Sequence, residues 1–481
     1  MEKTSKNNSA KTVIVIGGGI GGLYSAWKLL KKGFQVVVIE KQNQLGGLST
    51  SILYKEYKMD IGPHFMTMPK NTELTKQIED LMKDDIIYIP DIHKWYRVFF
   101  KNSILKEYPP LYQVIFNNGL NSFLLSFFSY LKSKIKYSLI NSNFESAEEY
   151  VVGNYGKYLY KTWFKPYLDF NYGRNNHSIT IVQGKFPPLK LLEILEKISK
   201  KKKYEVGTSA TCQVNYCYFK YGMGTLANKL TKEIEGLGGK IIVSADVKNI
   251  NHNNIQKEIL IVRNNKEKKL FADIILYAVS PNITKRWFDD FIENGDTAKN
   301  SSHGILVYLF INKMEIFDWW LMTNYEPSFS FFRITQQSYL SRFVAPKGKS
   351  LLCIEINTKE KEYLWELENE ELFKKIKDEL AQIKVFDTNQ IEDYKILKFK
   401  NLYHVPESNG NVLTEKLSST IDSMENEYMI GVEIDPGTLV TKRVEDSANS
   451  EIDNISLGGI YMTLEQSKHV IENIIAQSKR I

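Results

Sequence analysis

A glycine-rich turn near the N-terminus has the clearest chemical meaning in this sequence. Residues 17–22 (GGGIGG) carry the pattern G-x-G-x-x-G at Gly17, Gly19 and Gly22, with Gly21 inside it. In such a turn the first glycine permits a tight bend, the second lets the backbone approach a pyrophosphate, and the third lets a helix pack closely on a strand. The free N–H groups that begin the following helix favour an anion. The turn therefore predicts a phosphate-binding site.

The elements around this turn are those that a nucleotide site requires. Residues 12–16 form a short β-branched run that predicts a buried strand, residues 23–32 place apolar side chains at helical spacing, and residues 36–39 predict a second strand. Glu40 ends that strand, eighteen residues after Gly22, where a carboxylate can accept hydrogen bonds from ribose hydroxyls. We expect a βαβ unit that binds a dinucleotide.

A second glycine turn indicates which dinucleotide is bound. Residues 45–50 (LGGLST) follow Glu40 directly, and this stretch resembles the extended FAD fingerprint of the glutathione-reductase-like flavoproteins. Within that superfamily the chain resembles the branch of amine oxidases, protoporphyrinogen oxidases and phytoene desaturases. The resemblance implies FAD as the cofactor. It also implies contacts with FAD from Lys41, Gly46, Gly47, Leu48 and Ser49.

Further matches to this branch lie later in the chain. Residues 219–226 (FKYGMGTL), the pair Gly238-Gly239 and residues 245–247 (ADV) resemble the segment where the branch adds a strand beside the adenosine. In the family a backbone group at the position of Val247 contacts the adenine. The resemblance thus implies that Val247 binds the cofactor.

Two segments resemble a narrower group. Residues 60–64 (DIGPH) are similar to the flavin-side loop of UDP-galactopyranose mutases and of amine-oxidase-like enzymes of bacterial glycan loci. Residues 331–335 (FFRIT) resemble the segment with the mutases' second substrate arginine, which implies a substrate contact for Arg333. His64 either donates a hydrogen bond to the flavin and moves protons near neutral pH, or only packs in its loop.

Two departures from the family pattern count against assigning all of the family's contacts to this chain. Where the mutases have another diphosphate-binding arginine, this chain offers Lys185, whose ammonium is a point charge that cannot form a two-pronged clamp. The C-terminal flavin signature is also eroded. Spacing places it at Gly431, with a helix over 438–455 that includes Leu439; the alternative is Gly458-Gly459 with Tyr461.

The expected fold class is α/β, with a glutathione-reductase-like FAD-binding Rossmann domain into which a mixed α+β substrate domain is inserted. We expect a disordered leader over residues 1–11 and a helical extension over 456–481. The FAD-binding domain comprises 12–70, 205–285 and 400–455, and the substrate domain comprises 71–204 and 286–399. Further expected elements are a strand over 240–247 and a charged helix over about 360–382.

Composition and charge indicate which classes of partner to expect. The 481 residues carry a net charge of +7 without a basic stripe, so no nucleic-acid partner is expected. The three cysteines have no metal-ligand spacing, and no apolar run reaches the roughly 18 residues of a membrane span. Residues 122–131 (SFLLSFFSYL), which precede three lysines, predict a buried helix, with a helix on a membrane surface as the alternative. The expected location is cytoplasmic.

These patterns lead to three functional hypotheses. The first is an FAD-dependent oxidoreductase that transfers a hydride from a small-molecule substrate to flavin N5. The second is an isomerase of the UDP-galactopyranose mutase kind, which acts on a nucleotide sugar through reduced flavin. The third is a flavin-binding partner protein that has lost catalysis. If Arg333 and Lys185 both face the flavin, the substrate should be anionic, carrying a phosphate or carboxylate.

Overall fold

The structure is a computed structural model, and most of the chain is described in it. The described residues are 10–90, 95–100, 102–106, 119–140, 144, 146–172, 182, 214–252, 256–289, 291–292, 301–358, 362–404, 412–430 and 459–478. The expected leader over residues 1–11 therefore lies almost entirely outside this part of the chain.

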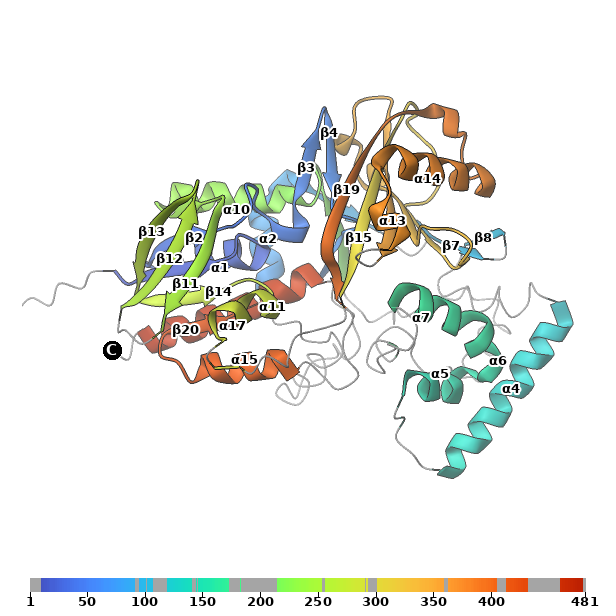
Figure 1. Cartoon of the computed structure of the whole chain (residues 1–481), viewed down its shortest axis with the longest axis horizontal. Helices are drawn as coiled ribbons and strands as arrows, with labels where there is room; N and C mark the ends of the chain where they lie inside the picture. The colour runs from blue at the N-terminus through green and yellow to red at the C-terminus, as the bar shows by residue number, and fades with distance from the viewer. Residues whose placement is uncertain are drawn as a thin grey trace, which may run out of the picture.

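A five-stranded parallel sheet forms the nucleotide-binding part of the molecule (Figure 1). Its strand order is β10 (Lys240–Ile242), β2 (Gln35–Ile39), β1 (Thr12–Ile16), β14 (Ile274–Tyr277) and β20 (Glu427–Met429). Along β1, Val13 and Val15 join one apolar cluster, whereas Ile14 and Ile16 join another. Both faces of the sheet are buried at its centre, which explains why the three central strands β2, β1 and β14 are apolar runs without alternation.

Different elements cover the two faces of this sheet. Helices α1 (Ile20–Leu30), α10 (Gly224–Gly236) and α17 (Gly459–Ser478) contribute to the cluster on one face, together with α2 (Glu73–Met82). The other face packs against an antiparallel meander and helix α15 (Val412–Asp422). The meander consists of β11 (Ala245–Asn251), β12 (Lys257–Arg263) and β13 (Lys266–Ala272). Helix α2, which we expected in the substrate domain, thus packs in the core beside the nucleotide turn.

The single strand expected over 240–247 is wrong, because the chain forms two strands there. Strand β10 joins the parallel sheet, and β11 begins the meander. Ser244 lies between them with a φ of 55°, a left-handed conformation that turns the chain out of the sheet. Its backbone N–H donates to the carbonyl of Gln42 at 2.9 Å, which fixes this turn beside the end of β2.

A seven-stranded mixed sheet forms the second part of the molecule. Its order is β19 (Ile391–His404), β15 (Ser301–Ile311), β18 (Ser350–Thr358), β17 (Arg333–Gln336), β16 (Leu321–Asn324), β7 (Tyr96–Phe100) and β8 (Ser103–Leu105). The expected charged helix appears as α13 (Tyr363–Glu366) and α14 (Asn369–Ile383), and α14 packs its apolar side on this sheet. This agrees with the mixed sheet expected for an inserted substrate domain.

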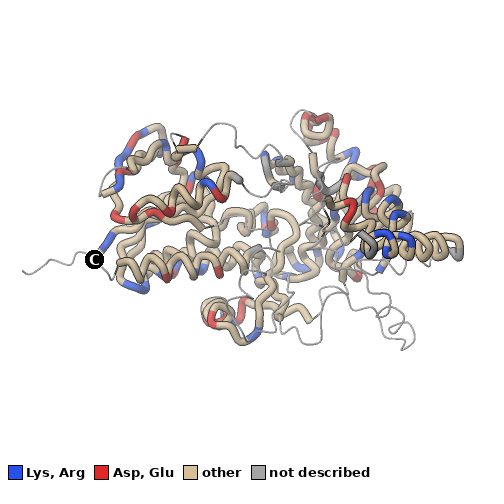
Figure 2. Tube along the Cα trace, turned by 90° about the horizontal axis from the view of Figure 1, so that it is seen from below, with Lys and Arg blue, Asp and Glu red and all other residues tan. Residues whose placement is uncertain are grey.

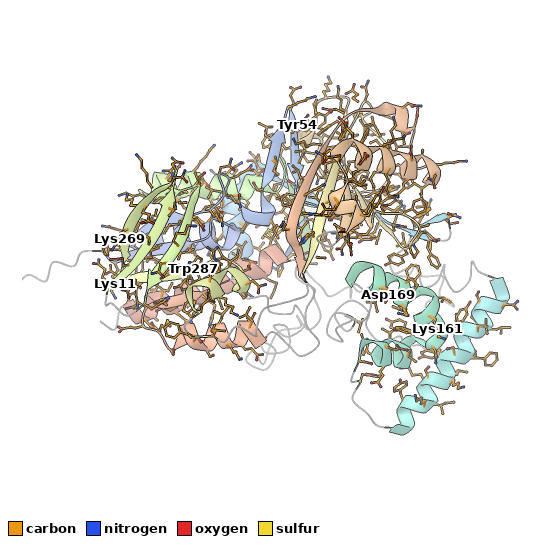
Figure 3. All side chains as sticks on the ribbon, viewed as in Figure 1. Lys11, Tyr54, Lys161, Asp169, Lys269 and Trp287 are labelled. Atoms are coloured by element: carbon orange, nitrogen blue, oxygen red, sulfur yellow. The ribbon has the colours of Figure 1, made fainter. Side chains whose placement is uncertain are left out.

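Short antiparallel pairs connect the two large sheets. The hairpin of β3 (Ser51–Tyr54) and β4 (Tyr57–Asp60) carries Tyr54 at the end of β3 (Figure 3). It reaches the mixed sheet, where Tyr54 stacks on Phe310 with ring centroids 5.2 Å apart. A small sheet combines β5 (Met66–Pro69), β9 (Val214–Phe219) and β6 (Ile86–Ile89). The loop between β4 and β5 therefore lies where the two parts of the molecule meet.

A helical lobe packs beside the mixed sheet (Figure 1). It contains α4 (Gly119–Ile140), α5 (Ala147–Tyr155), α6 (Lys157–Leu159), η4 (Tyr160–Phe164) and α7 (Lys165–Tyr172). The helix expected over 122–131 is present as part of α4, but the expectation that it is buried is wrong. Leu125 and Phe128 are exposed, because α4 is an outer helix that turns small side chains such as Ser126 towards the lobe.

The structure shows how charged and apolar residues are distributed over the described chain. Figure 2 shows basic and acidic residues mixed along most of the described chain. None of the helices in the described ranges combines the length and the hydropathy needed to cross a bilayer. Nor do the described residues contain a cluster of His, Cys, Asp and Glu that could hold a metal ion.

Candidate functional site

The first glycine turn has the geometry that a phosphate-binding turn requires. Gly17 has a φ of 112°, and a Cβ there would lie 2.4 Å from the carbonyl oxygen of Ala278. A Cβ on Gly22 would lie 2.1 Å from the carbonyl oxygen of Gly17, so both positions exclude a side chain. A Cβ on Gly19, at the N-cap of α1, would meet no described atom within 4 Å. Gly17 and Gly22 thus shape the turn, and Gly19 presents open backbone to a ligand.

The second glycine turn lies directly against the first. The N–H of Gly46 donates to the carbonyl of Gly18 at 2.8 Å, and Gly19 and Gly46 form a β-bridge. Gly46 and Gly47 have φ values of 106° and 57°, and a Cβ on Gly47 would lie 3.4 Å from the Cα of Gly19. Two glycine turns with free space beside them therefore line one surface, which continues into the short helix η1 (Gly47–Ser49).

Glu40 holds the edge of this surface. Its Oε2 accepts from the N–H of Gly18 at 2.7 Å, and its Oε1 accepts from the N–H of Gln42 at 2.8 Å. A carboxylate oxygen can accept a second hydrogen bond. Glu40 thus stays available to a ribose while it orders the turn.

The two remaining nucleotide-side residues of the sequence analysis have protein partners. Lys41 is exposed and lies 3.5 Å from the carboxylate of Asp246. The carbonyl of Val247 accepts a hydrogen bond from the indole N–H of Trp287 at 3.2 Å. Val247 therefore stands at the start of the meander, as expected from the family, but its carbonyl is already used within the protein.

The loop after β4 is fixed by the buried carboxylate of Asp60. Asp60 accepts hydrogen bonds from the hydroxyl of Ser51 at 2.5 Å, from the hydroxyl of Tyr218, and from the N–H of Met223 at 3.1 Å. Burial raises the pKa of Asp60 to about 6, against the effect of these hydrogen bonds. The carboxylate thus joins β3, β9 and the turn before α10 at one point.

Gln337 holds the same loop from the start of the short helix α12 (Gln337–Leu340), which directly follows β17. Its Oε1 accepts from the N–H of Asp60 at 3.1 Å, and its Nε2 donates to the carbonyls of Asp60 and Gly62 at 2.8 and 3.1 Å. Sequence reasoning missed Gln337, because these contacts span more than 270 residues and follow no local pattern. Its position four residues after Arg333 gave no signal of this role.

His64 extends from this loop towards the second glycine turn. Burial, together with the positive charge of Arg333, lowers the pKa of His64 to about 4, while hydrogen bonds with the backbone of Ile61 and Leu48 oppose the shift. The ring is therefore neutral near neutral pH, which disfavours the expected change of charge there. Its buried Nε2 has no hydrogen-bond partner among the described residues. Such an atom is suited to a hydrogen bond with a bound ligand.

Arg333 lies near His64, but its charge is paired. Its Nη2 donates to Oε1 of Glu355 at 2.7 Å, and Glu355 is the directly opposite residue on β18. Glu355 is almost completely buried, and the guanidinium carbon of Arg333 lies 4.5 Å from the ring centre of Phe332. The structure thus brings together His64 and Arg333, two of the three predicted catalytic residues. Lys185 lies outside the described residues.

The C-terminal helix packs on α1, the helix that follows the first glycine turn. Gly431, Leu439 and the helix expected over 438–455 lie outside the described residues. The described helix is α17, which begins at Gly459, the position of the alternative placement. Near its start the hydroxyl of Tyr461 lies 2.8 Å from that of Thr72.

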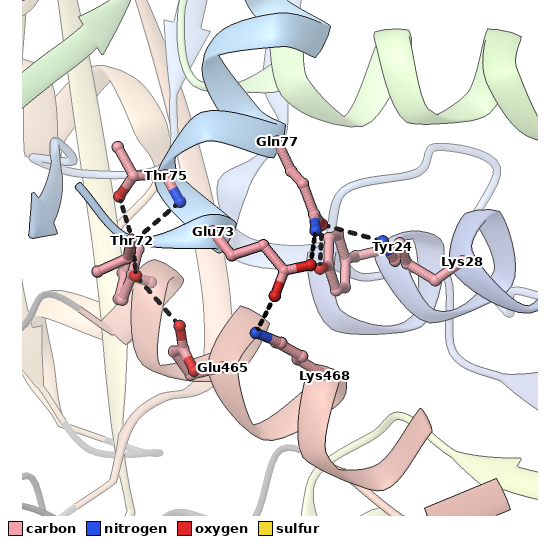
Figure 4. A network of polar contacts seen from close by, with 9 residues as sticks. Tyr24, Lys28, Thr72, Glu73, Thr75, Gln77, Glu465 and Lys468 are labelled. Atoms are coloured by element: carbon pink, nitrogen blue, oxygen red, sulfur yellow. Dashed lines mark hydrogen bonds and ion pairs between the residues drawn. The ribbon is translucent and has the colours of Figure 1, made fainter. Parts of the chain in front are cut away.

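Gly21 lies at the contact between α1 and α17. A Cβ on Gly21 would lie 2.8 Å from Cγ2 of Thr463, so the missing side chain makes room for α17 on α1. The expected cofactor contact of Gly21 stays a prediction, and the structure adds a role for this glycine in helix packing. Lys468 of α17 pairs with Glu73 of α2 at 2.7 Å, within the polar network of Figure 4.

Comparisons with known proteins agree with this geometry. Residues 15–81, which contain both glycine turns and Glu40, match the model of the NAD(P)-binding Rossmann-like domain. A solved structure of reduced UDP-galactopyranose mutase superimposes with a TM-score of 0.74 at 14% identity, over 97% of this chain and 96% of that one. A redesigned putrescine oxidase gives 0.62 at 12% identity, over 97% and 99%. The chain has the fold of these two structures. This confirms the α/β class, with its parallel Rossmann-like sheet and mixed substrate-domain sheet.

Sequence relatives cover a smaller part of the chain. A 4,4'-diaponeurosporene oxygenase of Staphylococcus haemolyticus is 32% identical over 108 residues, 22% of this chain and 22% of that protein. Its counterpart in Staphylococcus aureus is 28% identical over 169 residues, 35% of this chain and 30% of that protein. The chain thus matches about a third or less of the length of these relatives.

Proposed function

We propose that this chain binds FAD and is an FAD-dependent oxidoreductase. The observation that carries the proposal is the open backbone at Gly19, enclosed by the second glycine turn and by Glu40. A pyrophosphate fits there, because α1 begins at this point and its free N–H groups favour an anion. The ribose hydroxyls would bind Glu40. The buried, unpartnered Nε2 of His64 fits a polar atom of the ring system.

Several residues would act around the expected position of the flavin ring. FAD, when bound, accepts a hydride from the substrate at N5. Asp60 and Gln337 hold the loop that carries His64. His64 is neutral and serves as a hydrogen-bond partner. The N-terminus of α17 would stabilise negative charge on the ring, as a helix dipole does. The expected substrate is a small molecule.

The mutase-type isomerase is the second candidate, and Arg333 is the observation that favours it. Arg333 is partly exposed on β17 and near His64, where an anionic substrate group would meet it. Its pairing with Glu355 makes the pair neutral overall, which weakens it as an anion clamp. We therefore rank the oxidoreductase first. Substitution of Arg333 by Lys should raise KM for an anionic substrate much more than it changes the flavin spectrum.

Anaerobic absorbance of the FAD-loaded protein separates these candidates. Bleaching of oxidised FAD by an amine or by another reduced substrate supports the oxidoreductase. Turnover of a UDP-sugar only after the flavin has been reduced with dithionite supports the mutase. Stable FAD that responds to none of these compounds supports a partner protein without catalysis. Purified protein that retains no FAD and does not take it up would contradict the whole proposal.

A further inference from the structure

Helix α4 exposes a row of large apolar side chains on the outside of the helical lobe. We call Leu124, Leu125, Phe128 and Ile135 the α4 apolar face. Leu125, Phe128 and Ile135 are 54%, 63% and 62% exposed. A helix on the surface of a protein in water normally turns such residues towards the core. In Figure 1, α4 is the outermost helix of the lobe.

The opposite side of α4 is fixed to the lobe by small and polar contacts. Ser126, Tyr130 and Ser133 are buried there. The hydroxyl of Ser129 accepts from the N–H of Tyr158 at 2.9 Å, and a Cβ on Gly156 would lie 2.7 Å from the backbone N of Tyr130. This close packing prevents α4 from rotating to bury its apolar face. The exposure is thus a consequence of how the lobe is built.

The charged residues of α4 itself are all of one sign. Lys132 and Lys136 are exposed, and the whole helix from residue 119 to residue 140 contains no Asp or Glu. Lys134 points inwards and donates to the side-chain oxygen of Asn154 at 3.2 Å. Long lysine stems let the ammonium groups extend from an apolar face towards a polar layer. An apolar row on a helix whose own charges are all cationic complements a surface that is apolar inside and negatively charged outside.

We propose that α4 binds to the surface of a lipid bilayer that contains anionic lipids. The helix lies parallel to the surface, with the α4 apolar face at the boundary between headgroups and acyl chains and with Lys132 and Lys136 among the headgroups. A second copy of the chain fits less well, because two such faces would bring lysines together without a carboxylate from either helix. This inference does not depend on the proposed FAD chemistry.

Vesicle sedimentation tests the proposal with the full-length, FAD-loaded protein. The protein should sediment with vesicles of equal parts phosphatidylcholine and phosphatidylglycerol, and less with phosphatidylcholine alone. Added salt should reduce the binding because it screens the lysines. The double variant Leu125→Glu/Phe128→Glu should lower the partition coefficient at least about tenfold. The matched control for each single variant, Leu125→Glu or Phe128→Glu, is Leu53→Glu, which places the same charge on a similarly exposed leucine of the β3–β4 hairpin.

A second pair of variants keeps the test valid if that double variant does not fold. Lys132→Glu/Lys136→Glu should weaken binding to the phosphatidylglycerol vesicles and leave binding to phosphatidylcholine unchanged. The proposal is overturned if the unmodified protein stays in the supernatant with both vesicles, or if neither double variant weakens binding. It is also overturned if light scattering shows a dimer that Leu125→Glu/Phe128→Glu dissociates while no vesicle is bound. That outcome would assign the face to a second copy.

Discussion

Gly19 is the residue on which nucleotide binding depends most directly. Its φ of −69° suits any residue, and a Cβ would meet no described atom within 4 Å, so valine fits the fold but fills the ligand's space. Gly19→Val should therefore abolish FAD retention. Gly236→Val is the matched control, because its Cβ also points into open space, on α10. The FAD-to-protein absorbance ratio after desalting measures both. A Gly19→Val protein that keeps its FAD would disprove the assignment.

Glu40 is expected to act on the cofactor through its charge. Glu40→Gln keeps an oxygen for the N–H of Gly18 but removes the carboxylate that a ribose hydroxyl would meet. A hydrogen bond to a charged group contributes about 1.5–3 kcal/mol. FAD affinity should fall by that amount, measured by fluorescence titration of the apoprotein. Glu235→Gln on the exposed side of α10 should leave the affinity unchanged. Equal affinity in both variants would mean that Glu40 only orders the turn.

At the scale of elements, the contact between α1 and α17 decides how the C-terminal helix sits at the site. Gly21→Ala would place a methyl group 2.8 Å from Cγ2 of Thr463, and overpacking of this kind costs about 1–3 kcal/mol. Thr463→Ser removes that methyl group and should restore part of the stability in the double variant. Urea unfolding midpoints of the single and double variants measure this. If the double variant is no more stable than Gly21→Ala, the close contact at Thr463 is not the cause.

The same helix is held from its other side by charges. Glu73 of α2 accepts from Lys468, whose bond to the carboxylate lowers the pKa of Glu73, and also from Gln77 at 2.9 Å. The hydroxyl of Tyr24 on α1 donates to Gln77 at 2.9 Å. Three helices that are far apart in sequence therefore share one polar network (Figure 4). A substitution that weakens the packing of α17 should therefore disturb the nucleotide turn and the expected flavin-ring site together.

For the whole molecule, Asp60 links stability to pH, because it joins the two parts of the fold. Its folded pKa of about 6 is above the ordinary value of 3.8. Its contribution to the free energy of unfolding is therefore complete below pH 3.8 and is lost as pH rises through about 6. The titration of Asp60 changes the free energy of unfolding by on the order of 3 kcal/mol. Asp60→Asn stays neutral and should lose less stability between about pH 4 and about pH 7. Urea midpoints across this interval test it; parallel curves for the two proteins would contradict the expectation.

Another buried carboxylate acts in the opposite direction. Although burial alone would raise it, the pKa of Glu427 is lowered by His252, by the hydroxyl of Tyr277 and by Lys257. The contribution of Glu427 to the free energy of unfolding is present above its ordinary pKa and is lost as pH falls through its folded pKa. The difference between Asp60→Asn and the unmodified protein is thus best measured at each pH, because it cancels the titration of Glu427.

The sequence by itself determined the nucleotide-binding unit. Gly17, Gly19, Gly22 and Glu40 lie within one strand–turn–helix–strand unit. The geometry of the turn requires glycine at positions 17 and 22, open space for a ligand lies beside Gly19, and the carboxylate of Glu40 accepts from the turn. The α/β class followed from the same local patterns. Nothing in those patterns depends on distant parts of the chain, which is why they could be predicted.

Tertiary structure decided the rest. The pairing of Arg333 with Glu355, the bonds from Gln337 to the loop of Asp60 and the contact of Gly21 with α17 all join residues from separate elements. The outward face of α4 also depended on packing, because an apolar run predicts a helix but not which side its neighbours cover. Contacts at long sequence separation follow strand register and helix docking. A local pattern contains neither of these.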